Sequence, residues 1–157
     1  MKFIIALILV IIACAQGHQV NNDQVTVYTQ NNFGTEFNFD KPTFFLLYAP
    51  WCGHCKRLMP TWNELQEKMP DVRIAAVDCD SSKKFCGNFA ENGRMGYPML
   101  RFVGTDEKVY TYSGARDASS LIKFATGGYK NASKVVDFPQ KLKEELKSQT
   151  QQKNVEL

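Results

Sequence analysis

Residues 49–56 read Ala49-Pro50-Trp51-Cys52-Gly53-His54-Cys55-Lys56, the most informative segment of the chain. The two cysteines follow an apolar run and open a segment with helical periodicity. A helix N-terminus presents free backbone N–H groups and a partial positive charge, so it stabilises a Cys52 thiolate over the thiol. Cys55, one turn later, is close enough to attack a mixed disulfide formed at Cys52. This spacing predicts a redox centre in which Cys52 attacks and Cys55 resolves.

The two residues between the cysteines predict the direction of this chemistry. Gly53 places no side chain beside the sulfurs, and His54 can donate a hydrogen bond or positive charge toward the Cys52 thiolate. Both effects favour the reduced form, and a stabilised dithiol makes the corresponding disulfide a better oxidant. We therefore expect this centre to donate disulfides more readily than one with proline in place of His54.

The length and composition of the chain indicate one globular domain. The 157 residues are enough for a sizeable core, and the content of 44% hydrophobic and 22% charged residues is ordinary for such a domain. The net charge of +3 comes from dispersed lysines and arginines and gives no reason to expect a nucleic-acid partner.

The N-terminus reads as a secretory signal peptide over residues 1–17. Lys2 precedes an apolar run at residues 3–12, and small residues then allow cleavage after Ala15 or Gly17. The run is too short to span a bilayer, so no membrane attachment is expected after cleavage. The alternative is a bacterial lipoprotein signal that leaves Cys14 lipidated. In the first interpretation four cysteines remain, and an even number in an exported chain points to disulfides.

Hydrophobic periodicity predicts alternating strands and helices in the first half of the chain. Strands are expected at residues 25–29, 42–49 and 72–77, with helices at 30–39 and 52–68 between them. The third strand is parallel to the second if the long helix is a crossover. Pro60 lies inside this helix and is expected to kink it, separating a short active-site turn from the packed remainder.

The second half predicts a helix capped by Ser81-Ser82 and stopped near Asn92-Gly93, then a hairpin of strands at 99–103 and 109–113. A helix over residues 117–124 ends at Gly127-Gly128. An α/β domain with a mixed central sheet flanked by helices is therefore expected over residues 18–128.

Residues 129–157 form a polar C-terminal extension. A helix from about 139 to 153 carries Leu142 and Leu146 on a narrow apolar stripe, which predicts a solvated helix with weak docking, or one that binds a partner. Asn131-Ala132-Ser133 is a glycosylation sequon. The terminal Asn154-Val155-Glu156-Leu157 ends like an endoplasmic-reticulum retention signal.

The cysteine octapeptide resembles the active-site stretch of the protein disulfide isomerase family, whose domains have the thioredoxin fold. The resemblance runs from about residue 25 to 124 and includes Pro60, Val77-Asp78 and Gly96-Tyr97-Pro98. It implies that Cys52 is the nucleophile and that Cys55 is the resolving thiol.

The resemblance also implies a substrate-binding surface. A cis Tyr97–Pro98 bond would face the cysteines, where exposed backbone groups and Trp51 contact an extended substrate. Arg116 matches a loop arginine that swings toward the resolving cysteine and lowers its pKa. The alternatives are an ordinary trans proline and a solvated arginine at a helix start.

Three positions depart from the pattern of the family. Leu46 replaces a buried carboxylate that helps move the proton of the resolving thiol, and Ala76 replaces the basic residue often paired with it. Removing both charges together avoids leaving one alone in the core. We therefore expect Cys55 to release mixed disulfides more slowly than in relatives. Met99 replaces the usual threonine after the proline.

Cys79 and Cys86 occupy a place where some relatives carry a disulfide. We expect a structural bridge; the alternatives are two buried free thiols or a second, regulatory redox pair.

Together these features predict a thiol–disulfide oxidoreductase and isomerase that acts on cysteine-containing proteins folding in the secretory pathway. No metal or organic cofactor is expected, and glutathione or an upstream oxidase is an expected redox partner. The alternative is a redox-assisted chaperone or adaptor that binds unfolded clients around Trp51 and Tyr97. A zinc module lacks a second pair of ligands, and haem attachment lacks a histidine at Lys56. The expected location is the endoplasmic-reticulum lumen, with secretion as the alternative.

Overall fold

The computed structural model of the chain describes residues 19–155. The expected signal peptide and Glu156-Leu157 lie outside the described residues. Within the described part, no helix has the length and apolar character needed to cross a membrane.

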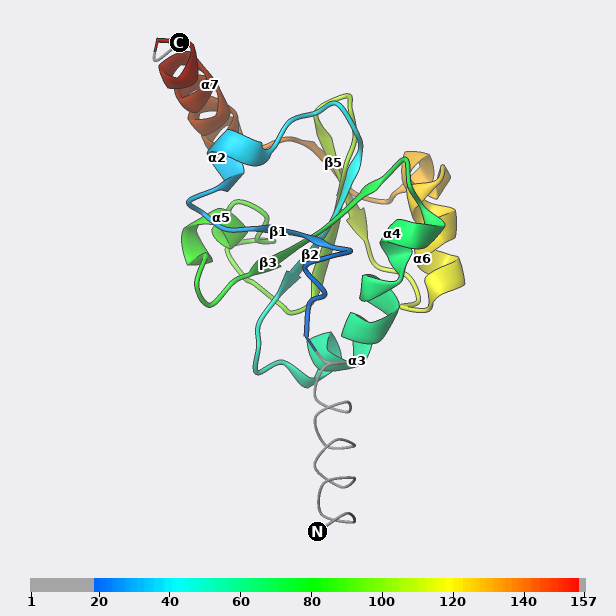
Figure 1. Cartoon of the computed structure of the whole chain (residues 1–157). Coiled ribbons are helices and arrows are strands. Elements are labelled where there is room, and N and C mark those ends of the chain that lie inside the picture. The colour runs from blue at the N-terminus through cyan, green and yellow to red at the C-terminus, as the bar shows by residue number, and fades with distance from the viewer. Residues whose placement is uncertain (1–18, 156–157) are drawn as a thin grey trace.

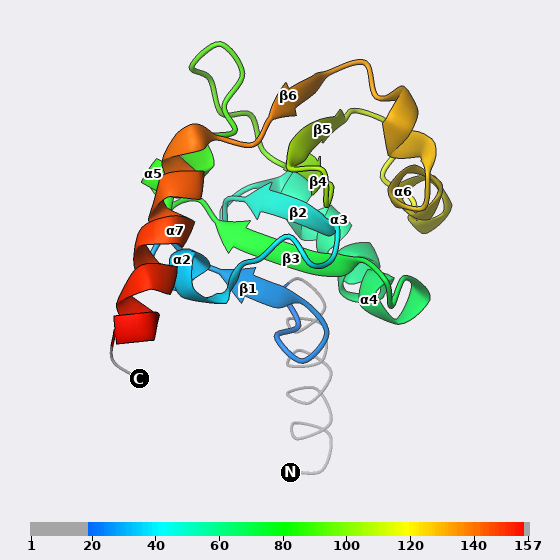
Figure 2. The ribbon, with the colours of Figure 1, turned by 90° about the horizontal axis from the view of Figure 1, so that it is seen from above.

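A six-stranded mixed sheet forms the centre of the domain (Figures 1 and 2). Its strands are β1 (Thr26–Tyr28), β2 (Thr43–Tyr48), β3 (Arg73–Asp78), β4 (Met99–Val103), β5 (Lys108–Tyr112) and β6 (Val135–Asp137), in the order β1-β3-β2-β4-β5-β6. β1 and β2 run parallel to β3, whereas β4, β5 and β6 each pair antiparallel with the strand before them in this order. The predicted mixed sheet and its hairpin are confirmed.

Helices cover both faces of the sheet. α3 (Gly53–Asn63), α4 (Leu65–Lys68) and α6 (Ala118–Ala125) lie on one face, and α2 (Phe33–Glu36), α5 (Lys83–Gly87) and α7 (Gln140–Val155) lie on the other (Figure 2). Side chains alternate along a strand, so Phe44 and Leu46 of β2 enter the first hydrophobic cluster, while Phe45 and Leu47 enter the second. The chain is thus a three-layer α/β/α domain, as predicted.

Buried side chains on one face of α3 hold this helix against the sheet. Leu58, Met59 and Trp62 are buried, and the Trp62 indole N–H donates to the backbone oxygen of Ala75 in β3 at 3.2 Å. Pro60 lies inside α3, which continues to Asn63, and the break between α3 and α4 comes at Glu64. Pro60 is exposed, and proline's fixed φ is compatible with a helix, so packing on the opposite face keeps the segment helical.

Two of the expected helices are shorter than predicted. α2 is a single turn, and Phe37 leaves it in an extended conformation while both Phe33 and Phe37 remain buried. α5 ends at Gly87, ahead of the expected stop, and Asn92 and Gly93 instead adopt positive φ in a separate tight turn closed by the Glu91–Arg94 backbone bridge. At Asn92-Gly93, therefore, local turn chemistry takes the place of the expected helix end.

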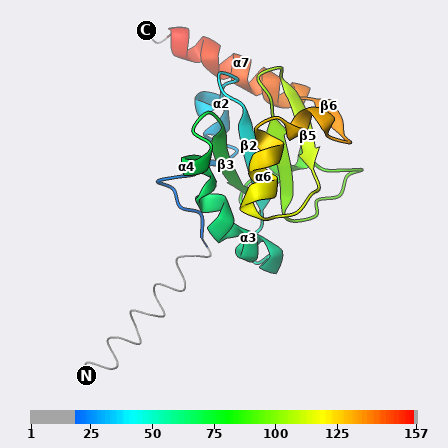
Figure 3. The same ribbon diagram turned by 90° about the vertical axis from the view of Figure 1, so that its right-hand side faces the viewer.

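The segment after residue 128 packs more firmly than expected. The 3-10 helix η1 (Gly128–Asn131) stacks Tyr129 on Phe102 at 4.4 Å between ring centroids, and β6 extends the sheet. Phe138 and Leu142 are each 2% exposed and fix the start of α7 beside α2. The expectation of weak docking is wrong here because Phe138, just before the helix, adds an aromatic anchor. α7 lies at the opposite end of the molecule from α3 (Figures 1 and 3).

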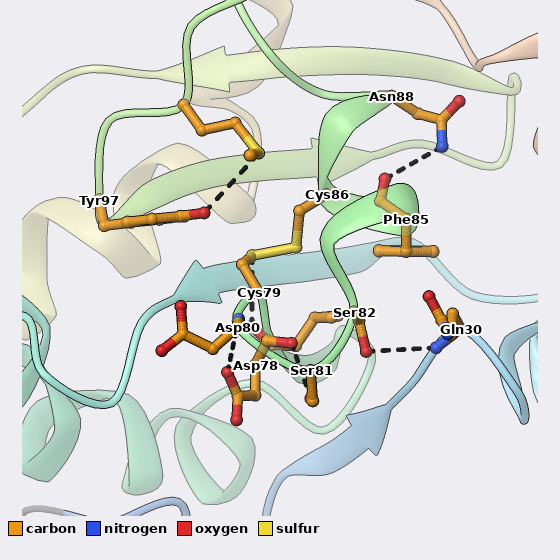
Figure 4. Close-up of a disulfide and its surroundings, with 12 residues drawn as sticks. Gln30, Asp78, Cys79, Asp80, Ser81, Ser82, Phe85, Cys86, Asn88 and Tyr97 are labelled. Atoms are coloured by element: carbon orange, nitrogen blue, oxygen red, sulfur yellow. Dashed lines mark hydrogen bonds between the residues drawn. A yellow bond between two sulfur atoms is a disulfide. The ribbon is translucent and has the colours of Figure 1, made fainter.

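A disulfide joins Cys79, just after β3, to Cys86 in α5 (Figure 4). Both residues are fully buried, and the surrounding loop is held by polar contacts. The Ser82 hydroxyl accepts from the Gln30 backbone N–H at 3.3 Å, and gives α5 no side-chain cap.

Removing this disulfide is expected to destabilise the domain. The bridge closes a short loop, so the Cys79→Ala/Cys86→Ala variant should lose about 2–3 kcal/mol of unfolding free energy. Urea unfolding under non-reducing conditions measures the difference. As a control, the native protein and the variant should become similarly stable once the native bridge is reduced. Equal stability without reductant would contradict a structural role for the bridge.

Candidate active site

The two remaining cysteines lie where the sheet meets α3. Cys52 is the N-cap of α3, four residues beyond the end of β2, and its sulfur accepts a hydrogen bond from the Cys55 backbone N–H at 3.3 Å. Both thiols are free. Cys52 is 7% exposed and Cys55 is 1% exposed. A partner therefore meets Cys52 first, and Cys55 lies behind it.

The Tyr97–Pro98 loop lies against the first sulfur. The peptide bond between these residues is cis, and the Cys52 thiol donates to the Tyr97 backbone oxygen at 3.6 Å. The Trp51 ring is 67% exposed and meets the Tyr97 ring edge-on at a centroid distance of 5.9 Å. The structure thus gathers the predicted residues Trp51, Tyr97 and Pro98 around Cys52, from two segments far apart in the sequence.

Burial makes Cys55 a weak acid. Its pKa is raised to about 12, chiefly by burial and further by the hydrogen bond and negative charge of Cys52. The Ala49 backbone and the positive charge of Arg116 act in the opposite direction. When Cys52 forms a mixed disulfide, its effect on the pKa of Cys55 disappears. Burial, which is the largest cause of the raised pKa, remains. Cys55 is therefore protonated near neutral pH.

Release of a mixed disulfide by Cys55 is expected to depend steeply on pH. The thiolate is the attacking form, and its fraction grows about tenfold per pH unit below the pKa. The raised pKa of Cys55 thus predicts a release rate that climbs from about pH 6 to about pH 9 without levelling. Stopped-flow release of a mixed disulfide at each pH measures this. A plateau below about pH 8 would show that the proton leaves by another route.

The structure also shows the surroundings of three other predicted site residues: Arg116, His54 and Gly53. Arg116 is exposed in the loop before α6, and its positive charge lowers the pKa of Cys55 against the larger effect of burial. The Nδ1 atom of His54 lies 2.7 Å from Nη2 of Arg57, so this ring hydrogen-bonds to a neighbour that sequence reasoning missed. At Gly53 a Cβ would lie 3.7 Å from Arg57 Nη1, an ordinary contact, so space alone does not require glycine.

The interior behind the cysteines is apolar. Leu46 and Ala76 are paired in register on β2 and β3, and both are fully buried. They share a hydrophobic cluster with Leu58 and Met59, the residues of α3 that follow Cys55. The two sequence departures are therefore neighbours in space, and neither position supplies a carboxylate or a basic group to this cluster.

Two further residues lie at the site that the sequence analysis did not identify. Tyr48, at the end of β2, packs against Ala49 and the two cysteines. Met95 is 38% exposed, and its sulfur accepts a hydrogen bond from the Tyr97 hydroxyl at 3.7 Å. The position of Tyr48 at the end of the apolar strand could have identified it from the sequence. Nothing in the local sequence identifies Met95, because the tertiary fold determines its neighbours.

Comparison with known proteins agrees with this geometry. Residues 24–127 match the family described as Thioredoxin. The chain belongs to the thioredoxin family. Among curated thioredoxin-family relatives, a probable protein disulfide-isomerase A6 from Medicago sativa is 39% identical over 109 residues, covering 67% of this chain and 29% of that protein. Protein disulfide-isomerase 1 from Dictyostelium discoideum is 33% identical over 142 residues, covering 87% of this chain and 37% of the relative.

Solved structures show the same thioredoxin fold. The J-Trx1 fragment of ERdj5 superposes with a TM-score of 0.59 at 28% identity, over 69% of this chain and 53% of that one. The first thioredoxin domain of mouse protein disulfide-isomerase A4 has a TM-score of 0.59 at 23% identity, over 71% and 79% of the two chains. The predicted single thioredoxin-like domain is confirmed. The chain spans about a third of the length of the curated relatives described above.

Proposed function

We propose that this protein is a thiol–disulfide oxidoreductase and isomerase that exchanges disulfides with cysteine-containing client proteins through Cys52 and Cys55. The observation that carries the proposal is the pairing of two free thiols, of which Cys52 is 7% exposed and Cys55 is 1% exposed. Cys52 caps α3 beside the Tyr97 backbone, and Cys55 lies one turn behind it with its N–H on the Cys52 sulfur. The disulfide isomerases among its relatives support the same chemistry.

The exchange proceeds in two balanced steps. The Cys52 thiolate attacks one sulfur of a client disulfide, and the other client sulfur leaves with the electron pair and takes up a proton. The Cys55 thiolate then attacks the Cys52 sulfur, which releases the second client thiolate and closes the Cys52–Cys55 disulfide. In the reverse direction a client thiolate attacks the Cys52 sulfur of the oxidised pair and Cys55 leaves as the thiolate; a second client thiolate then displaces Cys52, so the client leaves with a disulfide and the enzyme keeps two electrons.

The backbone at Tyr97 holds the client during these steps. An extended client segment can hydrogen-bond beside Cys52, and Trp51 and Tyr97 contribute apolar contact area. The scheme uses no metal or organic cofactor, because the disulfide itself carries the electrons. Glutathione or an upstream oxidase returns the pair to its starting state.

The proposed location is the endoplasmic-reticulum lumen. The apolar N-terminal run with small residues before the cleavage site and the Glu156-Leu157 ending support it. Asn131 is exposed in η1, where a glycosylation enzyme can reach the sequon. Localisation of tagged chains with and without residues 154–157 distinguishes retention from secretion.

Refolding of a scrambled, disulfide-bonded client tests the proposed activity. The native protein should restore client activity in a glutathione buffer, and the Cys52→Ser/Cys55→Ser variant should not. If both proteins prevent aggregation equally and neither speeds refolding, the chaperone function replaces the enzymatic one. An equilibrium titration of Trp51 fluorescence against glutathione then gives the reduction potential and the preferred direction of exchange.

A further inference from the structure

The sheet ends at β6 in a strand with exposed apolar side chains. Val135 is 42% exposed and Val136 is 49% exposed, so both valines face solvent although they lie in a strand. β6 pairs with β5 on one side only and lies at the outer edge of the sheet (Figure 2). An edge strand with apolar side chains is a surface to which another strand can be added.

The hydrogen bonds between β5 and β6 show which residues of β6 use their backbone groups inside the sheet. The Thr111 N–H donates to the Lys134 oxygen at 3.0 Å, and the Phe138 N–H donates to the Glu107 oxygen at 2.9 Å. Hydrogen-bonded and non-hydrogen-bonded pairs alternate along an antiparallel ladder. Every second residue of β6 therefore bonds to β5, with Val136 between the two ends.

The residues on either side of Val136 direct their backbone groups outward. The N–H and C=O groups of Val135 and Asp137 point away from β5, and within residues 19–155 these groups have no hydrogen-bond partner. The opposite edge of the sheet differs, because the Val27 oxygen of β1 accepts a hydrogen bond from the Asn32 side chain at 3.1 Å. The open edge of the sheet is thus the one at β6.

The charges and the symmetry of β6 fit a second copy of the same strand. Lys134 precedes the strand and Asp137 ends it, so an antiparallel copy brings each basic end to an acidic end, whereas a parallel copy brings like charges together. The outward-facing residues 135 and 137 lie symmetrically about Val136. A two-fold axis at Val136 therefore places Val135 of each copy opposite Asp137 of the other, and each such pair exchanges both of its backbone hydrogen bonds.

We propose that β6 is the contact through which two copies of this chain pair into a symmetric dimer, with their sheets joined edge to edge. The two Val136 side chains meet at the axis as a non-hydrogen-bonded pair, the type in which opposing residues lie closest, at about 4.5 Å between Cα atoms. Val136 also borders a cavity of about 310 Å³ whose lining includes Phe89 and Val109, so the second valine gains further apolar contact there.

This arrangement sets the size and the strength of the assembly, and it does not depend on the proposed function. Each copy uses its β6 edge on the other, so the contact closes at two chains and does not continue into a filament. β6 has three residues, so the contact buries less than the roughly 1,200 Å² of a stable complex. The dimer therefore forms reversibly and at high protein concentration.

Sedimentation equilibrium tests the pairing in the full chain with Cys52→Ser/Cys55→Ser, which removes the two free thiols and with them covalent links between copies. The average mass is expected to rise from that of one chain toward that of two between about 5 µM and about 1 mM protein. Val136→Lys places like charges at the axis and should hold the mass at one chain throughout. Val136→Thr keeps the β-branched shape and should retain the rise.

A mixture of two charge variants separates self-pairing from misfolding. Val136→Lys and Val136→Glu should each stay monomeric alone, and an equimolar mixture should regain the dimer, because unlike charges then meet at the axis. A single-chain mass at every concentration, a dimer that persists in Val136→Lys, or a mixture that stays monomeric would overturn the pairing. An unfolded, cysteine-free peptide that binds the monomeric parent but not Val136→Lys would also overturn it, since the edge then accepts client segments.

Discussion

Replacing Cys52 by serine is expected to abolish disulfide exchange, lowering the rate by at least about 1,000-fold. A hydroxyl cannot form the mixed disulfide on which both steps depend. Cys55 does not substitute for it, because that thiol is 1% exposed and burial raises its pKa. Release of thionitrobenzoate from an activated peptide measures the loss directly.

The matched control is Cys55→Ser, which keeps the attacking sulfur and removes the resolving one. This variant should complete the first step and then accumulate client mixed disulfides, seen as bands on non-reducing gels that disappear with reductant. The opposite pattern, in which Cys52→Ser retains exchange and Cys55→Ser loses its first step, would reverse the assignment of the two thiols.

Introducing a carboxylate at Leu46 is expected to accelerate the second step by about 10- to 100-fold near neutral pH. Leu46 and Ala76 face each other across β2 and β3 in the cluster that also contains Leu58 and Met59. A buried glutamate there has a raised pKa and can accept the Cys55 proton, so the pH dependence of release should flatten as well. Stopped-flow measurement of mixed-disulfide lifetime across the pH range checks both effects.

A matched variant separates the role of the proton acceptor from that of the added polar atoms. Leu46→Gln has the same size as Leu46→Glu but accepts no proton in this range, so its release rate should follow the native protein. An isolated charge in an apolar cluster is costly and can prevent the Leu46→Glu variant from folding on its own. In that case the double variant Leu46→Glu/Ala76→Lys replaces it, because position 76 lies in register with position 46 and the lysine forms an ion pair with the glutamate. Unchanged release in a folded glutamate variant would show that Leu46 does not limit the second step.

Much of the fold follows from patterns that act locally. The apolar strand before Cys52, the helical spacing of Leu58, Met59 and Trp62, and the hairpin after Pro98 each appear in the sequence and in the structure. Element ends were harder to predict. Pro60 did not divide α3, and Asn92-Gly93 formed a turn beyond α5 instead of ending it. Packing across a helix and the preference of Asn-Gly for positive φ decided these cases.

The segment after residue 128 shows the limit of a pattern-based prediction. Its helix carries few apolar residues, but Phe138 and Leu142 are buried against residues that precede them by about 100 positions, including Phe37. Arg101 is a similar case, because a charged residue inside a strand pattern gives no hint of its contacts with Phe89 and Glu91. Long-range contacts of this kind do not appear in local periodicity.

The sequence by itself determined how the two thiols are placed: two residues apart at a helix start, after a strand buried on both faces. That much is local, because spacing along the chain and the direction of the backbone decide it. Only the tertiary structure decided which sulfur is less deeply buried, what covers the other, and which side chains border them. Those properties depend on burial and on the Tyr97–Pro98 loop, which the fold brings to Cys52 from a distant part of the chain.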